Sequence, residues 1–477
     1  MRGRGIETEI GPARQIEHRK LGAKIRRRDV GSTRKARRGL QACHIGLHVD
    51  HHATRRSHGI MRPEGGVSMG FTANARETAD VDGLAALSAE HRLIGRILGA
   101  DWSVAATRPW PASWFSGIDW QKVPGLAWQH KIRPMATAAL REAGWPNVPA
   151  DIRDALEKAE RDCVTRAFRQ IALLRDIAAA ASAAGLRIIF LKGIALSAHL
   201  YGDPFIREAF DLDLLVHPDD RGPAGEMLIR LGLRPSRAVA LTLRQEAILQ
   251  RFSYDRKYVH AETGDVVECH HALDRNPDLV ATDFDALWQR RATVRVGDIA
   301  VAIPGDRDLA PYLGIHAARH GWERWKWLAD LAVLYRRPGP EGLSMLRADA
   351  RRAGNLSLFH SWILLVSGVA GTALPAELLR EARTDRRARR LANRALRMTL
   401  VLHTPATITQ APHTARVLAY RFALRRGVRY ARFELAALFR RDEDWYAWRF
   451  PDWAIPFYYV LRPFSFIRRQ ILLLVRS

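Results

Sequence analysis

Apolar residues recur at helical spacing over the first half of the chain once residue 83 is reached. Leu84, Leu93 and Ile97 belong to one apolar stripe, and a second stripe follows through residues 126–140. The alanine-rich stretch 155–184 predicts one long helix that ends near a glycine. We therefore expect an N-terminal helical subdomain over residues 83–184.

The pattern changes to short β-branched runs after residue 185. Residues 186–191 predict a buried strand that stops at Lys192 and Gly193, and 194–200 favours a helix. Residues 210–216 predict the next strand, followed by a helix through 227–229.

A hairpin is expected farther along this region. Residues 257–260 and 266–270 read as strands on either side of a Glu-Thr-Gly-Asp turn at 262–265. Short strands alternating with helices predict an α+β core with a small mixed sheet over residues 185–304.

Helical periodicity returns after residue 305. It predicts a second helical subdomain over 305–410, and an Arg- and aromatic-rich segment covers 411–477. Trp322, Trp325 and Trp327 are interpreted as core and helix-packing residues, with stacking on a nucleotide as the alternative.

Charge is distributed unevenly along the chain. The net charge is +25, and residues 1–60 contain 15 lysines and arginines against 5 acidic residues. Residues 1–68 are predicted to be a basic, disordered tail, or translated in error if Met61 or Met69 is the start. If exposed, the tail would contact nucleic acid non-specifically. Its Cys43 and neighbouring histidines lack the second close cysteine of a structural zinc site.

Composition otherwise describes an ordinary globular protein, with 47% hydrophobic and 8% aromatic residues. Three cysteines are too few for a disulfide framework, which favours a reducing, cytoplasmic setting. No stretch reaches the ~20 apolar residues that span a bilayer, so no transmembrane segment is expected.

A pair of carboxylates marks the strand at 210–216. Asp211 and Asp213 are two residues apart, so their side chains point to the same face of a strand. Carboxylates at this spacing repel each other unless a cation neutralises them, and hard oxygen ligands select Mg²⁺ or Mn²⁺. Glu268, in an apolar strand, is the candidate third carboxylate and a candidate base for an acceptor hydroxyl.

Three residues near this pair are candidates for phosphate binding. Lys192 and Gly193 form a turn before a helix N-terminus, where backbone N–H groups favour anions. Arg207 has the fork geometry that binds phosphate oxygens. The alternatives are a surface lysine in a turn, and a salt bridge from Arg207 to Asp203 or Asp211.

Three histidines complete the candidate site. His270 shares the face of Glu268 on a regular strand and is a candidate for a supporting role there. His316 and His320 lie on one helix face at i and i+4. Helix histidines with satisfied hydrogen bonds are the favoured interpretation, with one histidine lining the substrate cleft as the alternative.

Taken together, these motifs resemble a known family. The segments are LKGIAL at 191–196, LYGDP at 200–204, DLDLLV at 211–216, VECH at 267–270, IHAARHGW at 315–322, WLAD at 327–330 and the closing DW and YYVLRP at 444–445 and 458–463. They look like the largely uncharacterised bacterial nucleotidyltransferases of the DNA polymerase β-like superfamily, over residues 85 to the C-terminus. The sequence departs from the superfamily's broader pattern in two places: no serine directly follows Gly193, and the interval from Gly193 to Asp211 is long.

The resemblance implies a polymerase β-like nucleotidyltransferase core flanked by helical subdomains. It implies Asp211, Asp213 and Glu268 as metal-binding carboxylates, and Gly193 in the phosphate-binding turn. The expected reaction moves a nucleoside monophosphate (NMP) from a nucleoside triphosphate (NTP) to an unknown acceptor: a small molecule, sugar, peptide or protein. The rivals are a nucleotide-binding regulatory protein with weak or lost turnover, and a non-specific nucleic-acid-binding protein.

Overall fold

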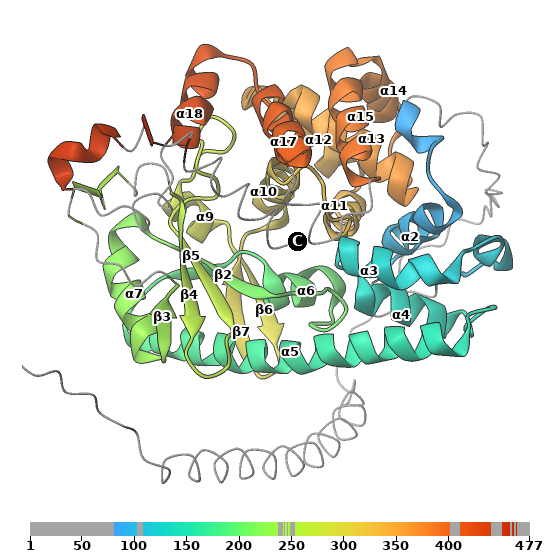
Figure 1. Cartoon of the computed structure of the whole chain (residues 1–477), viewed down its shortest axis with the longest axis horizontal. Helices are drawn as coiled ribbons and strands as arrows, with labels where there is room; N and C mark the ends of the chain where they lie inside the picture. The colour runs from blue at the N-terminus through green and yellow to red at the C-terminus, as the bar shows by residue number, and fades with distance from the viewer. Residues whose placement is uncertain are drawn as a thin grey trace, which may run out of the picture. The chain divides into compact units, whose positions relative to one another are not determined.

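The protein contains a five-stranded mixed sheet, which lies above the long helix α5 (Ala150–Ala183) in Figure 1. The computed structural model describes residues 81–102, 108–236, 253–400, 411–439 and 451–457, with a few isolated positions elsewhere. The strand order is β1-β2-β5-β4-β3. The strands are β1 (Ile188–Phe190), β2 (Asp211–Val216), β3 (Leu233–Pro235), β4 (Asp255–His260) and β5 (Val266–His270).

Strand β2 is an interior strand of this sheet, between β1 and β5. It runs antiparallel to β1 and parallel to β5, and β5 pairs in turn with β4 in the expected hairpin. The register sets Asp213 opposite Glu268. Its interior position explains why β2 is buried on both faces, with Leu212 and Leu214 fully buried.

Helices cover the sheet and link its strands. The predicted long helix is α5 (Ala150–Ala183), which runs beneath the sheet in Figure 1. Helix α6 (Gly193–Tyr201) follows β1, and α7 (Arg221–Arg230) follows β2 through a short 3-10 turn (Pro218–Asp220). Helix α9 (Phe284–Gln289) precedes a separate hairpin of β6 (Ala292–Val296) and β7 (Ile299–Ile303).

The helices before and after the sheet pack against each other. Helix α2 (Ala89–Gly99) contacts both α11 (Lys326–Arg336) and α13 (Leu356–Ala370), although more than 220 residues separate them in sequence. The crossing is close, since a Cβ added at Gly95 would lie 2.1 Å from the Val369 carbonyl oxygen. Segments that the sequence presents as two helical regions therefore share one core.

The remaining helices among the described residues lie before and after the sheet in sequence. They are α3 (Val123–His130), α4 (Arg133–Glu142), α10 (Asp306–Arg319), α12 (Gly339–Arg352), α14 (Ala376–Thr384), α15 (Arg386–Thr399), α17 (Ala411–Ala423) and α18 (Val428–Phe439), with short 3-10 turns at Asp82–Leu84, Ala112–Phe115, Trp120–Lys122 and Asp452–Ala454. The α+β fold expected from the sequence is confirmed, and Trp322, Trp325 and Trp327 are buried core residues, as interpreted. None of the helices among the described residues is long and apolar enough to cross a bilayer. Residues 1–68, with Cys43 and the two methionines considered as starts, lie outside the described residues.

Candidate active site

The two carboxylates of β2 have different environments. Asp213 is completely buried, whereas Asp211, at the first position of the strand, is partly exposed. Asp211 is the first residue of β2, whereas Asp213, two residues farther along, lies against Lys192 and His270. Strand alternation still places both on one face.

Asp213 is the most enclosed acid of the site. Its Oδ1 lies 2.9 Å from Nζ of Lys192 and 3.1 Å from Nε2 of His270. Burial alone would raise its pKa, but the Lys192 charge and the His270 hydrogen bond hold the pKa of Asp213 below its usual range. Its Oδ2 is buried and has no hydrogen-bond partner among the described residues.

Glu268 lies across the strand pair from Asp213 and is 22% exposed through its side chain. Its Oε2 is 3.8 Å from Nε2 of His270, and its Oε1 is 3.8 Å from Nζ of Lys257. Burial, followed by repulsion from Asp213 and Asp211, raises the pKa of Glu268 to about 7. Carboxylates this close without a cation between them are expected to behave in this way.

One group of side chains in the described structure has metal-ligand geometry. Ligand atoms of Asp213, Glu268 and His270 all lie within 4.8 Å of one another. The sequence expectation named Asp211 as the other carboxylate and His270 as a supporting residue. The structure instead brings His270 into the group and leaves Asp211 at its edge, where its charge acts on Glu268.

The donor set suits a divalent cation. Two carboxylates supply hard oxygen ligands, and the unpartnered Oδ2 of Asp213 leaves a buried acceptor for an ion to satisfy. The carboxylate oxygens suit Mg²⁺ or Mn²⁺, whereas an imidazole ligand is more typical of Zn²⁺, Cu, Fe or Ni. Because the ammonium of Lys192 already offsets one negative charge, the net charge of the group is lower than three carboxylates would give.

Lys192 and Gly193 place the first strand against the second. Lys192 is buried rather than on the surface, and its charge faces Asp213. Although burial disfavours its charged form, Asp213, Tyr312 and Asp211 hold its pKa well above the usual range. Gly193 has φ +70°, and a Cβ there would lie 2.7 Å from the Asp211 carbonyl oxygen. Glycine is required for this close approach.

Arg207 has a partner that was not considered from the sequence. Its guanidinium is buried and binds Asp330 of α11 through Nε and Nη2, at distances of 2.9 to 3.1 Å. The Tyr201 hydroxyl donates to the same carboxylate at 2.8 Å. Neither alternative from the sequence, phosphate binding or pairing with Asp203 or Asp211, describes this contact. Arg207 connects the core to α11 because a buried guanidinium needs a buried counter-charge.

The two helix histidines lie together at the C-terminal end of α10. The rings of His316 and His320 are 4.7 Å apart, and both contact Trp327. Burial and the charge of Lys192 lower the pKa of His316 well below the usual range, so it is neutral near pH 7. His320 is solvent-exposed and also interacts electrostatically with Lys192. Both histidines lie within electrostatic range of Lys192, and a role in lining the substrate cleft stays a prediction.

Three further residues at the site escaped the sequence analysis. Tyr312, two turns before Arg319 in α10, lies beside Lys192, and Tyr254 contacts the His270 ring with centroids 5.3 Å apart. Lys326 is buried and donates from Nζ to the Glu208 carbonyl at 3.1 Å. Lys326 directly precedes the WLAD segment at 327–330 and Tyr312 lies three residues before the segment at 315–322, so proximity to these motifs was the one available signal; Tyr254 lies in none of the quoted segments.

Comparison with known proteins places the fold in a family. The model of a family described as uncharacterised nucleotidyltransferase matches residues 116–371, more than half of the chain. No curated protein is significantly similar.

Two solved structures show a more distant likeness. They are a solution structure of the antibiotic-resistance factor ANT(2'')-Ia and a crystal structure of ANT(2'')-Ia in complex with adenylyl-2''-tobramycin. Each is 18% identical and covers 39% of this chain; the matches cover 92% and 98% of those chains, with TM-scores of 0.30 and 0.28. Both scores are low, so the family match carries the assignment. It confirms the resemblance found in the sequence: the chain belongs to the family of uncharacterised nucleotidyltransferases.

Proposed function

We propose that the protein transfers an NMP group from an NTP to a hydroxyl-bearing acceptor. We also propose that Mg²⁺ or Mn²⁺ binds at the cluster of Asp213, Glu268 and His270, which is called the carboxylate group below. The observation that carries this proposal is the convergence of Asp213, Glu268 and His270 within 4.8 Å, with Oδ2 of Asp213 unpartnered. Asp211 completes the charge of the site from the edge of β2.

The chain's own residues have distinct roles in this reaction. The acceptor oxygen attacks the α-phosphorus, the bond from phosphorus to the bridging β-oxygen breaks, and pyrophosphate leaves with that electron pair. Glu268 is the proposed base because its side chain is reachable from solvent, whereas Asp213 is fully enclosed. The acceptor proton passes to Glu268 and then to solvent.

The remaining roles belong to the divalent cations, to Lys192 and His270, and to the N-terminus of α6. When bound, divalent cations stabilise charge on the attacking and leaving oxygens. Lys192 and His270 hold the Asp213 carboxylate in one orientation through its Oδ1. Oδ2 of Asp213, which has no hydrogen-bond partner among the described residues, would be available to the ion. The N-terminus of α6 at Gly193 offers backbone N–H groups to phosphate oxygens.

A labelling experiment tests the reaction. Each α-labelled NTP is incubated with the protein, Mg²⁺ and a cell lysate, and the molecule that acquires label is identified. We expect Glu268→Gln and Asp213→Asn to lower the initial rate at least about 100-fold, since each substitution removes a charge that the transition state requires.

The matched control is Glu262→Gln in the exposed turn of the same hairpin, which should transfer label at the wild-type rate. Transfer that persists in both active-site variants, while their circular dichroism spectra match the wild type, would show that the carboxylate group does not catalyse it.

A nucleotide-binding regulatory protein is the second candidate. The observation that favours it is the Lys192 ammonium at 2.9 Å from Asp213, which neutralises part of the charge that a metal would otherwise attract. This candidate predicts NTP binding with no label transfer to any acceptor and no release of pyrophosphate.

A further inference from the structure

Three arginines from separate parts of the fold lie within electrostatic range of one another, near the candidate active site. Arg275 follows β5, Arg319 is the last residue of α10, and Arg421 lies in α17, which packs against α10. Arg319 pairs with Asp274 at 3.3 Å and with Glu434 at 2.5 Å. Three positive charges therefore share two negative ones, and each arginine lies within electrostatic range of the others.

The surplus charge has no partner in the part of the chain that the structure describes. Neither the Arg275 nor the Arg421 guanidinium makes an ion pair or hydrogen bond there. Nε of Arg275, Nη2 of Arg319 and Nε of Arg421 are buried donors that remain unused. Burial and repulsion between the arginines lower the pKa of Arg421. Enclosed donors of like charge are costly unless an anion joins them.

The arginines are adjacent to the carboxylate group. Tyr254 contacts the His270 ring and interacts electrostatically with both Lys192 and Asp274. His320, next to Arg319 in sequence, experiences the charges of both Arg421 and Lys192. Along α10, Arg319 is seven residues from Tyr312, which lies beside Lys192. At 1.5 Å per residue this separation is about 10 Å, a distance that one phosphorylated substrate can span.

We propose that Arg275, Arg319 and Arg421 form a binding site for a phosphate group of a substrate held at the carboxylate group. The proposal rests on the proposed function, because that function brings phosphate-bearing molecules to this face. Guanidinium forks match phosphate oxygens, and the unused donors come from three separate chain segments, as a site that surrounds a tetrahedral anion requires. The phosphate belongs either to the outer part of the NTP or to a phosphorylated acceptor.

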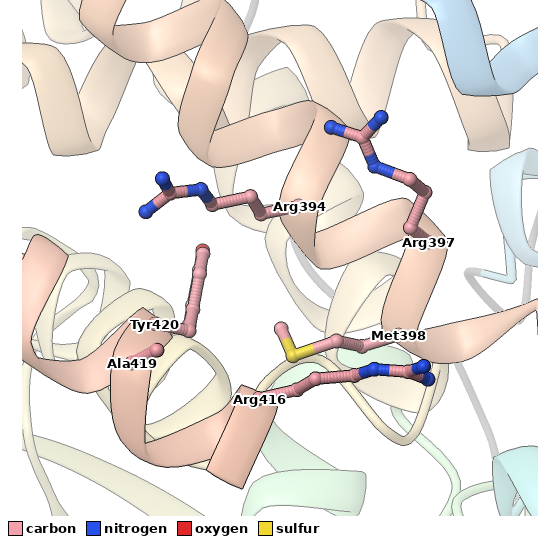
Figure 2. A pocket seen from close by; sticks show the side chains of 6 residues that line it. All are labelled: Arg394, Arg397, Met398, Arg416, Ala419 and Tyr420. Carbon is pink, nitrogen blue, oxygen red and sulfur yellow. The ribbon is translucent and has the colours of Figure 1, made fainter. Parts of the chain in front are cut away.

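Another group of arginines in the same helical layer serves for comparison. Arg394 and Arg397 of α15 and Arg416 of α17 line a cavity of about 560 Å³ together with Tyr420 (Figure 2). These three arginines are exposed, so water solvates their charges and no buried donor among them needs a ligand. Arg416 is in the same helix as Arg421, which makes it a matched control.

Binding of inorganic tripolyphosphate and of inorganic phosphate, measured by calorimetry in EDTA, tests the proposal. The variants are Arg275→Gln and Arg421→Gln, whose guanidinium groups have no partner to lose among the described residues. We expect each to weaken anion binding about tenfold, the usual effect of one charge-assisted hydrogen bond. Arg416→Gln should bind as the wild type does.

The two sources of the phosphate give different results. If the site takes the outer phosphates of an NTP, the variants weaken tripolyphosphate binding. If it takes a phosphorylated acceptor, tripolyphosphate binding is unchanged, and inorganic phosphate binds more weakly to variants already saturated with tripolyphosphate. The proposal is overturned if neither constant changes, if the wild type binds neither anion, or if Arg416→Gln has an equal effect.

Two further measurements separate this proposal from a structural role and from the proposed reaction. Removing a partly buried charge that has no ion pair among the described residues should leave the melting temperature of Arg421→Gln equal to or above that of the wild type, whereas a structural role would lower it. If a variant fails to fold, Arg275→Lys and Arg421→Lys keep the charge and test the loss of the fork. Arginine-dependent tripolyphosphate binding without label transfer would refute the reaction and leave the anion site intact.

Discussion

At the scale of single residues, burial distinguishes side chains that the sequence shows as equivalent. Asp211 and Asp213 are two residues apart in one strand, yet the first is partly exposed and the second is enclosed with Lys192 and His270. Lys192, predicted to bind phosphate with a surface lysine as the alternative, is buried and pairs with Asp213 at 2.9 Å. A side chain's role here depends on which neighbours replace water around it.

Lys326 offers a residue-scale prediction about pH. Burial, followed by the charge of Arg207, lowers the pKa of Lys326 to about 7. The unfolded chain keeps this proton up to about pH 10.4, so between those values the unfolded state binds more protons and stability rises with pH. Lys326→Met should therefore be more stable than the wild type at pH 7 and below, by up to about 5 kcal/mol.

The measurement is urea unfolding of both proteins from pH 6 to 10. The stability difference should be constant below pH 7 and shrink towards zero as pH 10 is approached. A stability difference that does not change with pH would mean that burial does not lower the pKa of Lys326, and it would contradict the prediction.

At the scale of elements, close packing joins helices distant in sequence. Helix α2 lies against the C-terminal end of α13, where Gly95 and Gly99 face the carbonyl oxygens of Val369 and Ala370. The apolar periodicity of 83–184 predicted that α2 has a buried face. It could not predict the partner, because many helices in the chain present similar apolar stripes.

Substitution of Gly95 tests this crossing. The added methyl group of Gly95→Ala would clash with backbone, which cannot rotate away, so we expect a loss of about 1–3 kcal/mol of stability. The control is Gly125→Ala in α3, where a Cβ meets nothing within 4 Å and alanine should stabilise by about 0.5–1 kcal/mol. Urea unfolding midpoints report both, and equal effects would contradict the close packing.

At the scale of the whole molecule, net charge conceals two kinds of basic region. Residues 1–60 carry 15 lysines and arginines against 5 acidic residues, which accounts for a large share of the +25. The described residues contain Arg275, Arg319 and Arg421, which we propose bind phosphate, and the exposed arginines of α15 and α17. General attraction to polyanions and specific phosphate binding are therefore separable.

A chain that begins at Met69 separates them experimentally. It should transfer label at the wild-type rate but bind DNA much more weakly, with a smaller slope of log affinity against log salt, because fewer counter-ions are released. DNA affinity that survives the truncation would assign it to the remaining residues, among which Arg394, Arg397 and Arg416 are the candidates.

The sequence by itself determined the local features of this protein. Alternating and helical apolar patterns located the strands around Asp213 and Glu268, the long α5 and the turn at Gly193, because local hydrophobic period and glycine placement act within a few residues. The tertiary structure alone decided the partner of Arg207, the entry of His270 into the carboxylate group, and the meeting of Arg275, Arg319 and Arg421. Those outcomes depend on strand register and helix crossings. These bring together segments that are far apart in the chain and exclude water between them, and so they decide which charged side chains become neighbours.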